Sequence, residues 1–146
     1  MLRLASAAVL AAAGVTFPHA TALIVTGKRS VTLRVEVAST DAHRAHGLMN
    51  RRSLAPNAGM VFLFATPTRA RFWMKDTLIP LSIAFYDRRG RILRILDMAP
   101  CRADPCRVYD AGVAYRGALE VNRGAFRRWG AARGSRITVA RRSSRA

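Results

Sequence analysis

Short apolar runs separated by turn residues constrain the fold of this chain more than any other feature. Over residues 31–37, apolar and polar side chains alternate, which is typical of a strand with one buried face. Residues 59–64 are almost continuously apolar and are bounded by turn residues, which indicates a strand that is covered on both faces. The stretch 71–90 predicts two further strands with a break near Pro80. A chain with this pattern must fold mainly into short strands.

The remaining segments complete the pattern and add two short helices. Strands are predicted at residues 91–98, 117–121 and 135–140, and a tight hairpin turn at residues 87–90, where Gly90 suits a positive φ. Helices are expected at residues 41–49, behind the capping residues Ser39 and Thr40, and within residues 124–132. We therefore expect an α+β domain, mainly antiparallel β, with a small, partly closed barrel-like sheet and one or two short helices.

The first 22 residues, MLRLASAAVLAAAGVTFPHATA, have the composition of a secretory signal peptide. Arg3 precedes an apolar stretch over residues 4–15, and Ala20-Thr21-Ala22 offers a small-x-small cleavage pattern. An uncleaved N-terminal anchor is the alternative, although the stretch is short for a membrane span. No later stretch is apolar enough to cross a membrane. We predict a periplasmic or secreted protein.

This prediction divides the chain into four parts. Residues 1–22 are the signal peptide, residues 23–30 a short N-terminal linker, residues 31–140 a single globular domain and residues 141–146 a basic tail. We see neither an internal repeat nor a second domain.

The formal net charge of +17 at pH 7 would usually indicate a nucleic-acid partner. Export argues against nucleic acid and favours anionic envelope surfaces. Almost all basic residues are arginines, with Lys28 and Lys75 as the only lysines, and the chain is rich in alanine. This pattern fits a GC-rich genome, so we interpret the charge as compositional and keep selected anion binding as the alternative.

The two cysteines, Cys101 and Cys106, lie close together in PCRADPCRVYD. In an oxidising compartment such a pair first predicts a disulfide, and Asp104-Pro105 supplies a turn that brings the two residues together. Four residues separate them, so the spacing is not that of thiol redox enzymes. A redox or metal-binding pair is the alternative.

Trp73, Lys75 and Asp76 are the most distinctive polar group in the chain. Alternation places Asp76 on the same face as Phe72 and Met74, which predicts a partly buried carboxylate. Arg44 is a candidate partner, and a structural aspartate that caps the turn before Pro80 is the alternative. Lys75 is a candidate base or anion ligand, or simply an exposed strand lysine.

Metal and catalytic motifs are weak. His43 and His46 share a helix face but lack a third ligand nearby, so we predict no metal site and no cofactor. A thioether site for copper is conceivable, although methionines in apolar runs usually fill a core; the candidates are Met49, Met60, Met74 and Met98. A carboxylate pair of Asp76 and Glu120 is the one acid–base arrangement that suggests itself. No catalytic triad, nucleophile elbow or phosphate loop is found.

Five motifs follow one another along the chain: Arg44-Ala-His-Gly-Leu-Met-x-Arg51, Gly59-Met-x-Phe-x-Phe64, Phe72-Trp-Met-Lys-x-Thr-x-x-Pro80-Leu-x-Ile-x-Phe85, Gly90-x-Ile92 and Ala118-Leu-Glu120. In this order they resemble the domain of unknown function 192 family (DUF192), and the resemblance covers residues 31–139. The loop from Cys101 to Cys106 is similar to that of exported members. The resemblance implies a small, largely β domain and no particular activity. The family usually has Asn at position 76 and Asp at position 82, so this chain, with Asp76 and Ser82, is read as having moved a carboxylate between the two positions.

The function that we expect is non-catalytic binding by an exported domain, with a small ligand, an envelope component or a protein as the partner. An aromatic ring beside Arg and Lys suits an anionic or sugar-like partner. The candidate binding residues are Arg44, Arg51, Trp73, Lys75, Asp76 and Glu120. A hydrolase that uses Asp76 or Glu120 with Lys75 or Arg44 is the first alternative. Periplasmic copper handling through methionine and histidine is the second.

Overall fold

The protein, a computed structural model, is described over residues 14–141. Most of the predicted signal peptide and residues 142–146 of the predicted tail lie outside this range. The strands are β1 (His19–Val25), β2 (Ser30–Ala38), β3 (Ala58–Thr68), β4 (Phe72–Trp73), β5 (Leu81–Tyr86), β6 (Ile92–Met98), β7 (Val108–Tyr109), β8 (Tyr115–Asn122) and β9 (Arg136–Arg141). The helices are α1 (Asp41–His46) and α2 (Ala125–Trp129).

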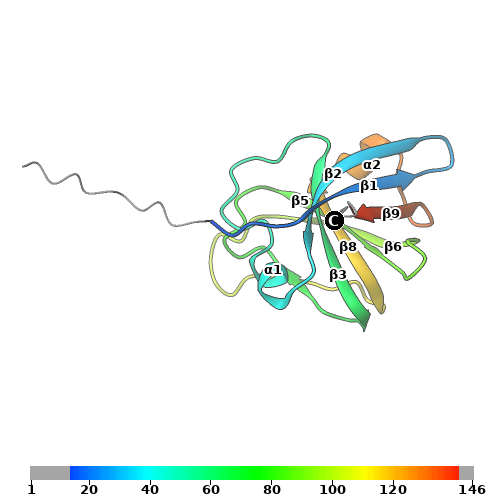
Figure 1. The fold of residues 1–146 in the computed structure, drawn as a ribbon. Helices are drawn as coiled ribbons and strands as arrows, with labels where there is room; N and C mark the ends of the chain where they lie inside the picture. The colour runs from blue at the N-terminus through cyan, green and yellow to red at the C-terminus, as the bar shows by residue number, and fades with distance from the viewer. Residues whose placement is uncertain (1–13, 142–146) are drawn as a thin grey trace, which may run out of the picture.

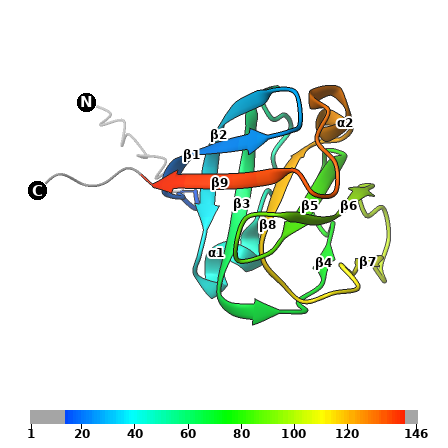
Figure 2. The ribbon, with the colours of Figure 1, turned by 90° about the vertical axis from the view of Figure 1, so that its right-hand side faces the viewer.

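Seven strands form one curled sheet in the order β6-β5-β8-β3-β2-β1-β9, and β4 pairs with β7 in a separate two-stranded sheet (Figures 1 and 2). All neighbours in the large sheet are antiparallel except β2 and β3, which are parallel. A bridge between Arg91 and Arg136 joins the two edges at one point, so the sheet forms a half-barrel. The predicted fold class is confirmed.

Alternation along the central strands separates two cores. Val61, Ala84 and Leu119 face the inside of the half-barrel, where residues of all seven strands pack together with Phe126 of α2. The intervening residues of β3, β5 and β8 belong to a second cluster on the outer face, which is covered by Leu48 after α1 and by Tyr109 of β7. Side-chain alternation on a strand requires this division, because successive residues point to opposite faces.

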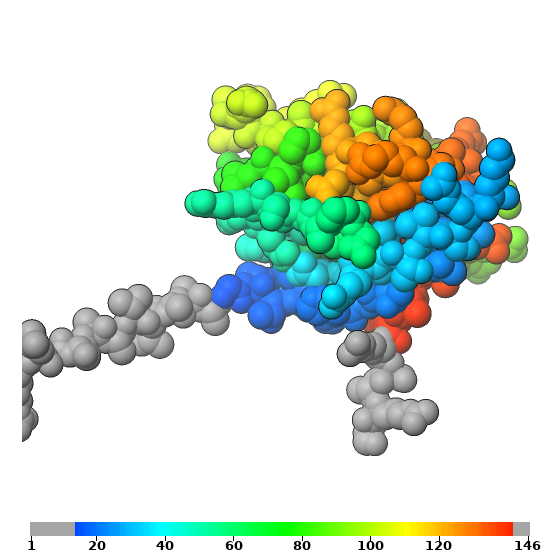
Figure 3. All heavy atoms as spheres, turned by 90° about the horizontal axis from the view of Figure 1, so that it is seen from above, coloured from blue at the N-terminus to red at the C-terminus, as the bar shows by residue number. Residues whose placement is uncertain are grey.

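The first strand of the sheet differs from the sequence expectation. β1 begins at His19, so the predicted signal boundary at Ala22 falls inside it, and the predicted linker at residues 23–30 contains its last three residues. Ala20, Ala22 and Ile24 of β1 are buried, and the carbonyl of Pro18 accepts a hydrogen bond of 2.8 Å from the Val37 amide. The small residues that suggest a cleavage site are suited to this place because they fit inside a narrow barrel. In Figure 3 the blue N-terminal segment adjoins the red C-terminal strand, as the pairing of β1 with β9 requires.

Both helices have ends that follow from local chemistry. Thr40 caps α1, because its hydroxyl accepts a hydrogen bond of 3.1 Å from the His43 amide. Gly47, with φ +51°, ends α1 three residues before the predicted position. Among the described residues, no helix is long and apolar enough to cross a membrane.

A chain that begins at Leu23 should be less stable than a chain that begins at Gly14. The shorter chain lacks the buried residues Phe17, Ala20 and Ala22 and more than half of β1, so we expect its free energy of unfolding to fall by several kcal/mol. Urea denaturation of the two purified chains measures the difference. Equal denaturation midpoints would show that β1 does not contribute to the fold as described.

Candidate functional site

A cavity of about 290 Å³ opens on the outer face of the sheet, between α1 and the strands β3 and β4. Its wall is largely aromatic, its mouth is basic and its inner end holds one carboxyl group. The lining residues that matter for its chemistry are Asp41, Arg44, His46, Phe62, Phe64, Arg71, Phe72, Trp73 and Glu120. We call this cavity the aromatic pocket.

Glu120 lies at the buried end of the aromatic pocket. It belongs to β8 in the middle of the sheet, opposite Met60 of β3 and Ile83 of β5, and only 4% of its surface is exposed. Its carboxyl group makes no hydrogen bond or ion pair with any residue from 14 to 141. Burial raises the pKa of Glu120 to about 8, because the charged form loses its hydration. At neutral pH the group therefore holds its proton and can donate a hydrogen bond to a ligand.

The wall of the pocket is built from aromatic rings that support one another. The rings of Phe62 and Phe72 meet edge to face at 5.0 Å, and Phe72 contacts the buried Phe85 at 5.8 Å. Trp73, half exposed, stands at the mouth. Such a wall is rigid and offers ring faces and edges to an apolar or planar ligand.

Arg44 forms the basic side of the mouth and is held in place by three contacts. Its Nη1 donates to the carbonyl of Leu63 at 2.8 Å, its Nη2 pairs with Asp41 at 2.7 Å, and its guanidinium lies 5.0 Å from the centre of the Phe64 ring. Arg71 also lines the mouth and makes no ion pair within residues 14–141. The mouth therefore favours a ligand that has an anionic or strongly polar outer end.

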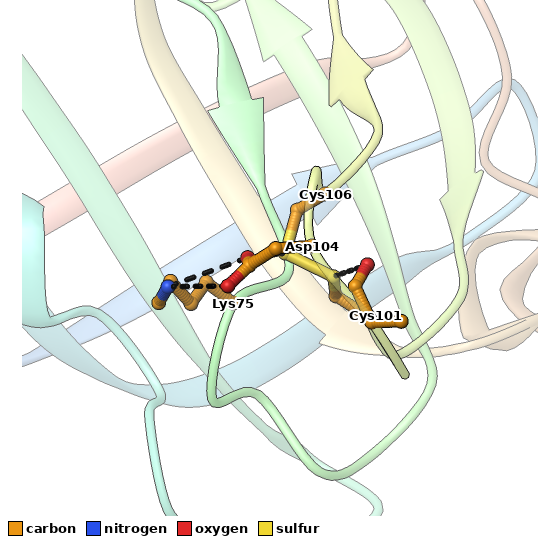
Figure 4. Close-up of polar contacts among 5 residues, drawn as sticks. Lys75, Cys101, Asp104 and Cys106 are labelled. Atoms are coloured by element: carbon orange, nitrogen blue, oxygen red, sulfur yellow. Dashed lines mark hydrogen bonds and ion pairs between the residues drawn. A yellow bond between two sulfur atoms is a disulfide. The ribbon is translucent and has the colours of Figure 1, made fainter.

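Three of the six predicted binding residues, Arg44, Trp73 and Glu120, line the aromatic pocket. Lys75 lies beside it: its Nζ is 5.7 Å from the centre of the Trp73 ring and 3.3 Å from both carboxylate oxygens of Asp104 (Figure 4). Lys75 thus joins the pocket mouth to the cysteine loop rather than lining the pocket.

Asp76 and Arg51 are placed elsewhere. The prediction that Asp76 is a partly buried carboxylate is wrong, because β4 ends at Trp73 and Asp76 lies in an exposed turn with φ +53°. Its carbonyl accepts a hydrogen bond of 2.8 Å from the Asn50 amide. Arg51 makes two hydrogen bonds of 2.7 Å to the carboxylate of Glu36, so this guanidinium is already paired.

The cysteine pair forms the predicted disulfide, with a Cα–Cα distance of 5.5 Å (Figure 4). Potential ligand atoms of Cys101, Asp104 and Cys106 lie within 4.8 Å of one another. Both sulfurs belong to the disulfide, however, and metals bind the free thiolate. The bridge ties together the loop that pairs with Lys75.

Most residues of the copper alternative are used in packing. Met60, Met74 and Met98 are fully buried in the outer core. The rings of His43 and His46 are tilted against the ring of Phe17, at 4.6 and 6.1 Å between ring centres. Met49 and His46 are partly buried and line the aromatic pocket, so two of the six candidate ligands face an open cavity.

Ser82 has a carboxylate partner, although it is not Asp76. Its hydroxyl donates a hydrogen bond of 2.6 Å to Asp97, which lies directly opposite on β6, and accepts one of 3.0 Å from the Gly124 amide. Asp97 on the neighbouring strand is therefore the carboxylate beside position 82, whereas Asp76 lies in a separate exposed turn.

The structure adds residues that sequence reasoning did not include in a site. Phe62, Phe64, Arg71 and Phe72 were read as parts of strands. Their aromatic spacing alone does not distinguish a pocket wall from a core, because the distinction depends on whether α1 covers them completely.

Comparisons with known proteins agree on the fold and leave the activity open. The family model DUF192, described as an uncharacterised ACR, matches residues 22–139. A candidate transcription regulator from Sinorhizobium meliloti 1021 is similar in structure, with a TM-score of 0.81 and 30% sequence identity over 86% of this chain and 97% of that one. A protein of unknown function from Novosphingobium aromaticivorans DSM 12444 has a TM-score of 0.77 and 30% identity over 88% and 94% of the two chains. No curated protein matches the chain.

The stability of the protein should depend on pH through Glu120. Its pKa is about 8 in the folded chain and 4.5 ordinarily, so between these values the folded chain holds a proton that the unfolded chain has released. The free energy of unfolding therefore falls as pH rises through this window, by on the order of 1 kcal/mol per pH unit at its steepest, and levels off above it. Glu120→Gln should remove this fall, because an amide does not titrate. Urea denaturation across the window measures both profiles.

Glu36→Gln, at the other glutamate of the chain, is the matched control and should leave the slope unchanged. The wild type, Glu120→Gln and Glu36→Gln share the remaining ionisable groups of the pocket, which are Asp41, Arg44, His46 and Arg71. Parallel profiles for the wild type and Glu120→Gln would contradict a buried, protonated Glu120.

Proposed function

The chain belongs to the DUF192 family, and we propose that it is an exported, non-catalytic binding domain that holds a small organic ligand in the aromatic pocket. One observation carries the proposal: Glu120 is buried at the inner end of an open cavity and has no partner within residues 14–141. A buried polar group without a partner costs free energy. A ligand that supplies the missing hydrogen bond recovers that cost, which explains why the group is placed there.

The chemistry of the lining indicates the form of the ligand. The aromatic wall suits a planar or branched apolar body. The protonated carboxyl of Glu120 suits a hydrogen-bond acceptor, such as a carbonyl or ether oxygen, at the inner end of the ligand. Arg71 and Arg44 suit a polar or anionic group at the outer end. We therefore propose a small amphipathic molecule that enters with its apolar, uncharged end first.

Binding is favoured over hydrolysis because the pocket offers a single available acid. Asp41, the other carboxylate of the lining, is already paired with Arg44 and is fully exposed. Of the residues that the hydrolase alternative names, Glu120 and Arg44 line the pocket, whereas Asp76 and Lys75 do not. Acid–base hydrolysis with two carboxylates therefore lacks its second group at this site.

Export is supported by the disulfide, since such bonds persist mainly in oxidising compartments. The apolar N-terminal stretch after Arg3 supports it independently. A ligand taken up in the cell envelope or outside the cell is consistent with a pocket that opens directly to solvent at Trp73.

The test is a thermal-shift screen of small amphipathic carbonyl compounds, followed by calorimetric titration of the hits. Glu120→Leu removes the hydrogen-bond donor at similar volume and should weaken binding by about tenfold or more. Glu120→Gln keeps a donor and should bind at neutral pH. In the wild type, affinity should fall as pH rises above about 8, where Glu120 loses its proton, and in Glu120→Gln it should not.

Trp73→Ala should also weaken binding, because it removes the ring at the mouth, whereas Glu36→Gln should have no effect. A hit binds outside the aromatic pocket if its affinity is the same for the wild type, Glu120→Leu and Trp73→Ala. If every hit behaves in this way, the proposal is contradicted.

A further inference from the structure

A second candidate site lies at one end of the half-barrel, where β5 ends and β8 begins. Two adjoining cavities of about 480 and 320 Å³ open there and share Leu63, Tyr86, Arg88 and Arg141. Only Phe64 of their lining also belongs to the aromatic pocket. We call this region the barrel mouth. Mouths of β-barrels are frequent places for ligand sites, because the strands hold the surrounding side chains firmly.

The floor of the barrel mouth is rigid and largely apolar, with one polar atom, the Tyr86 hydroxyl, which has no hydrogen-bond partner within residues 14–141. Tyr86 is buried and its ring lies against Gly117, where an added Cβ would overlap the ring. Leu63 and Val139, both partly buried, pack against the same inner core. Burial raises the pKa of Tyr86, so its hydroxyl stays neutral and the floor carries no charge.

The rim of the barrel mouth is formed by four arginines from three separate segments. Arg88 and Arg89 lie in the turn after β5, Arg116 on β8 and Arg141 at the end of β9. The Nε of Arg116 donates to the Phe64 carbonyl at 3.2 Å, which fixes its direction and leaves its two terminal nitrogens free. Within residues 14–141, none of the four guanidinium groups pairs with a carboxylate.

Asp87 is the single acid in this lining, and its side chain is engaged in the turn. One carboxylate oxygen accepts hydrogen bonds from the amides of Arg89, at 2.8 Å, and Arg91, at 3.0 Å. The barrel mouth therefore has four cations against one carboxylate that is committed to the backbone. Its net positive charge is left for a ligand to neutralise.

We propose that the barrel mouth binds a phosphate group. Guanidinium groups bind phosphate oxygens through pairs of parallel hydrogen bonds, and these charge-assisted bonds are among the strongest that proteins make. A phosphate dianion balances the excess charge of the rim better than a single carboxylate does. The apolar floor beneath the rim further suits a phosphate that carries a hydrocarbon body. Free phosphate and the phosphate of a lipid headgroup share this chemistry.

Because the chain is rich in arginine, the test must separate a specific site from general positive charge. Arg88→Gln with Arg141→Gln removes two exposed charges from the rim. Arg127→Gln with Arg128→Gln removes two exposed charges from α2, which lies by the opposite ends of β5 and β8, and is the matched control. All four side chains are exposed, so both double variants should keep the thermal stability of the wild type.

Three probes distinguish the sources of the phosphate: inorganic phosphate, a soluble short-chain phosphatidic acid, and vesicles of phosphatidylcholine with or without phosphatidic acid. Calorimetry and vesicle sedimentation measure the affinities. We expect the rim variant to bind at least one phosphate probe about tenfold or more weakly than the wild type, and the α2 variant to bind it within about twofold. Binding of inorganic phosphate indicates a site for free phosphate, and binding restricted to the phosphatidic acid probes indicates a headgroup.

Equal weakening in both double variants would show general charge attraction and overturn the proposal, as would the absence of binding by the wild type to all probes. If the wild type also binds a DNA duplex, and both double variants lose the same affinity for it, that result likewise shows general charge attraction and overturns the proposal. The Glu120→Leu variant should bind the phosphate probes normally, so this test does not depend on the aromatic pocket.

Discussion

The burial of β5, β8 and the first half of β3 on both faces is the constraint on which the rest of this structure depends. Each of these segments supplies side chains to the inside of the half-barrel and, at the alternate positions, to the outer core. Where a strand is buried on both faces, every polar side chain loses its hydration, which costs free energy. A polar side chain at such a position therefore needs a local reason, and Ser82 has one in its hydrogen bonds to Asp97 and Gly124.

Glu120 is the exception that defines the site. It occupies an outward-facing position of β8 at which neighbouring strands place apolar side chains, and α1 stops at Gly47 before it covers this position. The short helix and the short β4–β7 sheet thus leave an opening over the one acid of the central strands. Because α1 ends early, the unpaired carboxyl group of Glu120 faces a cavity instead of a packed helix.

Much of this architecture follows from local sequence pattern, and the exceptions have identifiable causes. The strands of the large sheet from 31–37 onward and the hairpin at Gly90 are predictable because alternation and turn residues act over a few positions, whereas β7 was read as part of the cysteine loop. β1 is not, since its alanines, small enough for the barrel interior, also make a cleavage motif. Asp76 was misplaced because alternation was continued past Trp73, where the strand ends. The sequence identified three residues of the pocket, Arg44, Trp73 and Glu120. That they lie close together in space depends on the order of the strands in the sheet, which local sequence pattern does not determine.

The pairing of β1 with β9 places the first and last described strands side by side in one sheet. The outer edge of β1 is hydrogen-bonded only after β9 has been synthesised. The half-barrel is therefore completed only when nearly all of the described residues are present. Until then an unpaired strand edge is exposed, which is a hazard for association with other chains. Long-range closure of this kind also slows folding, because the chain ends must meet before the ladder stabilises them.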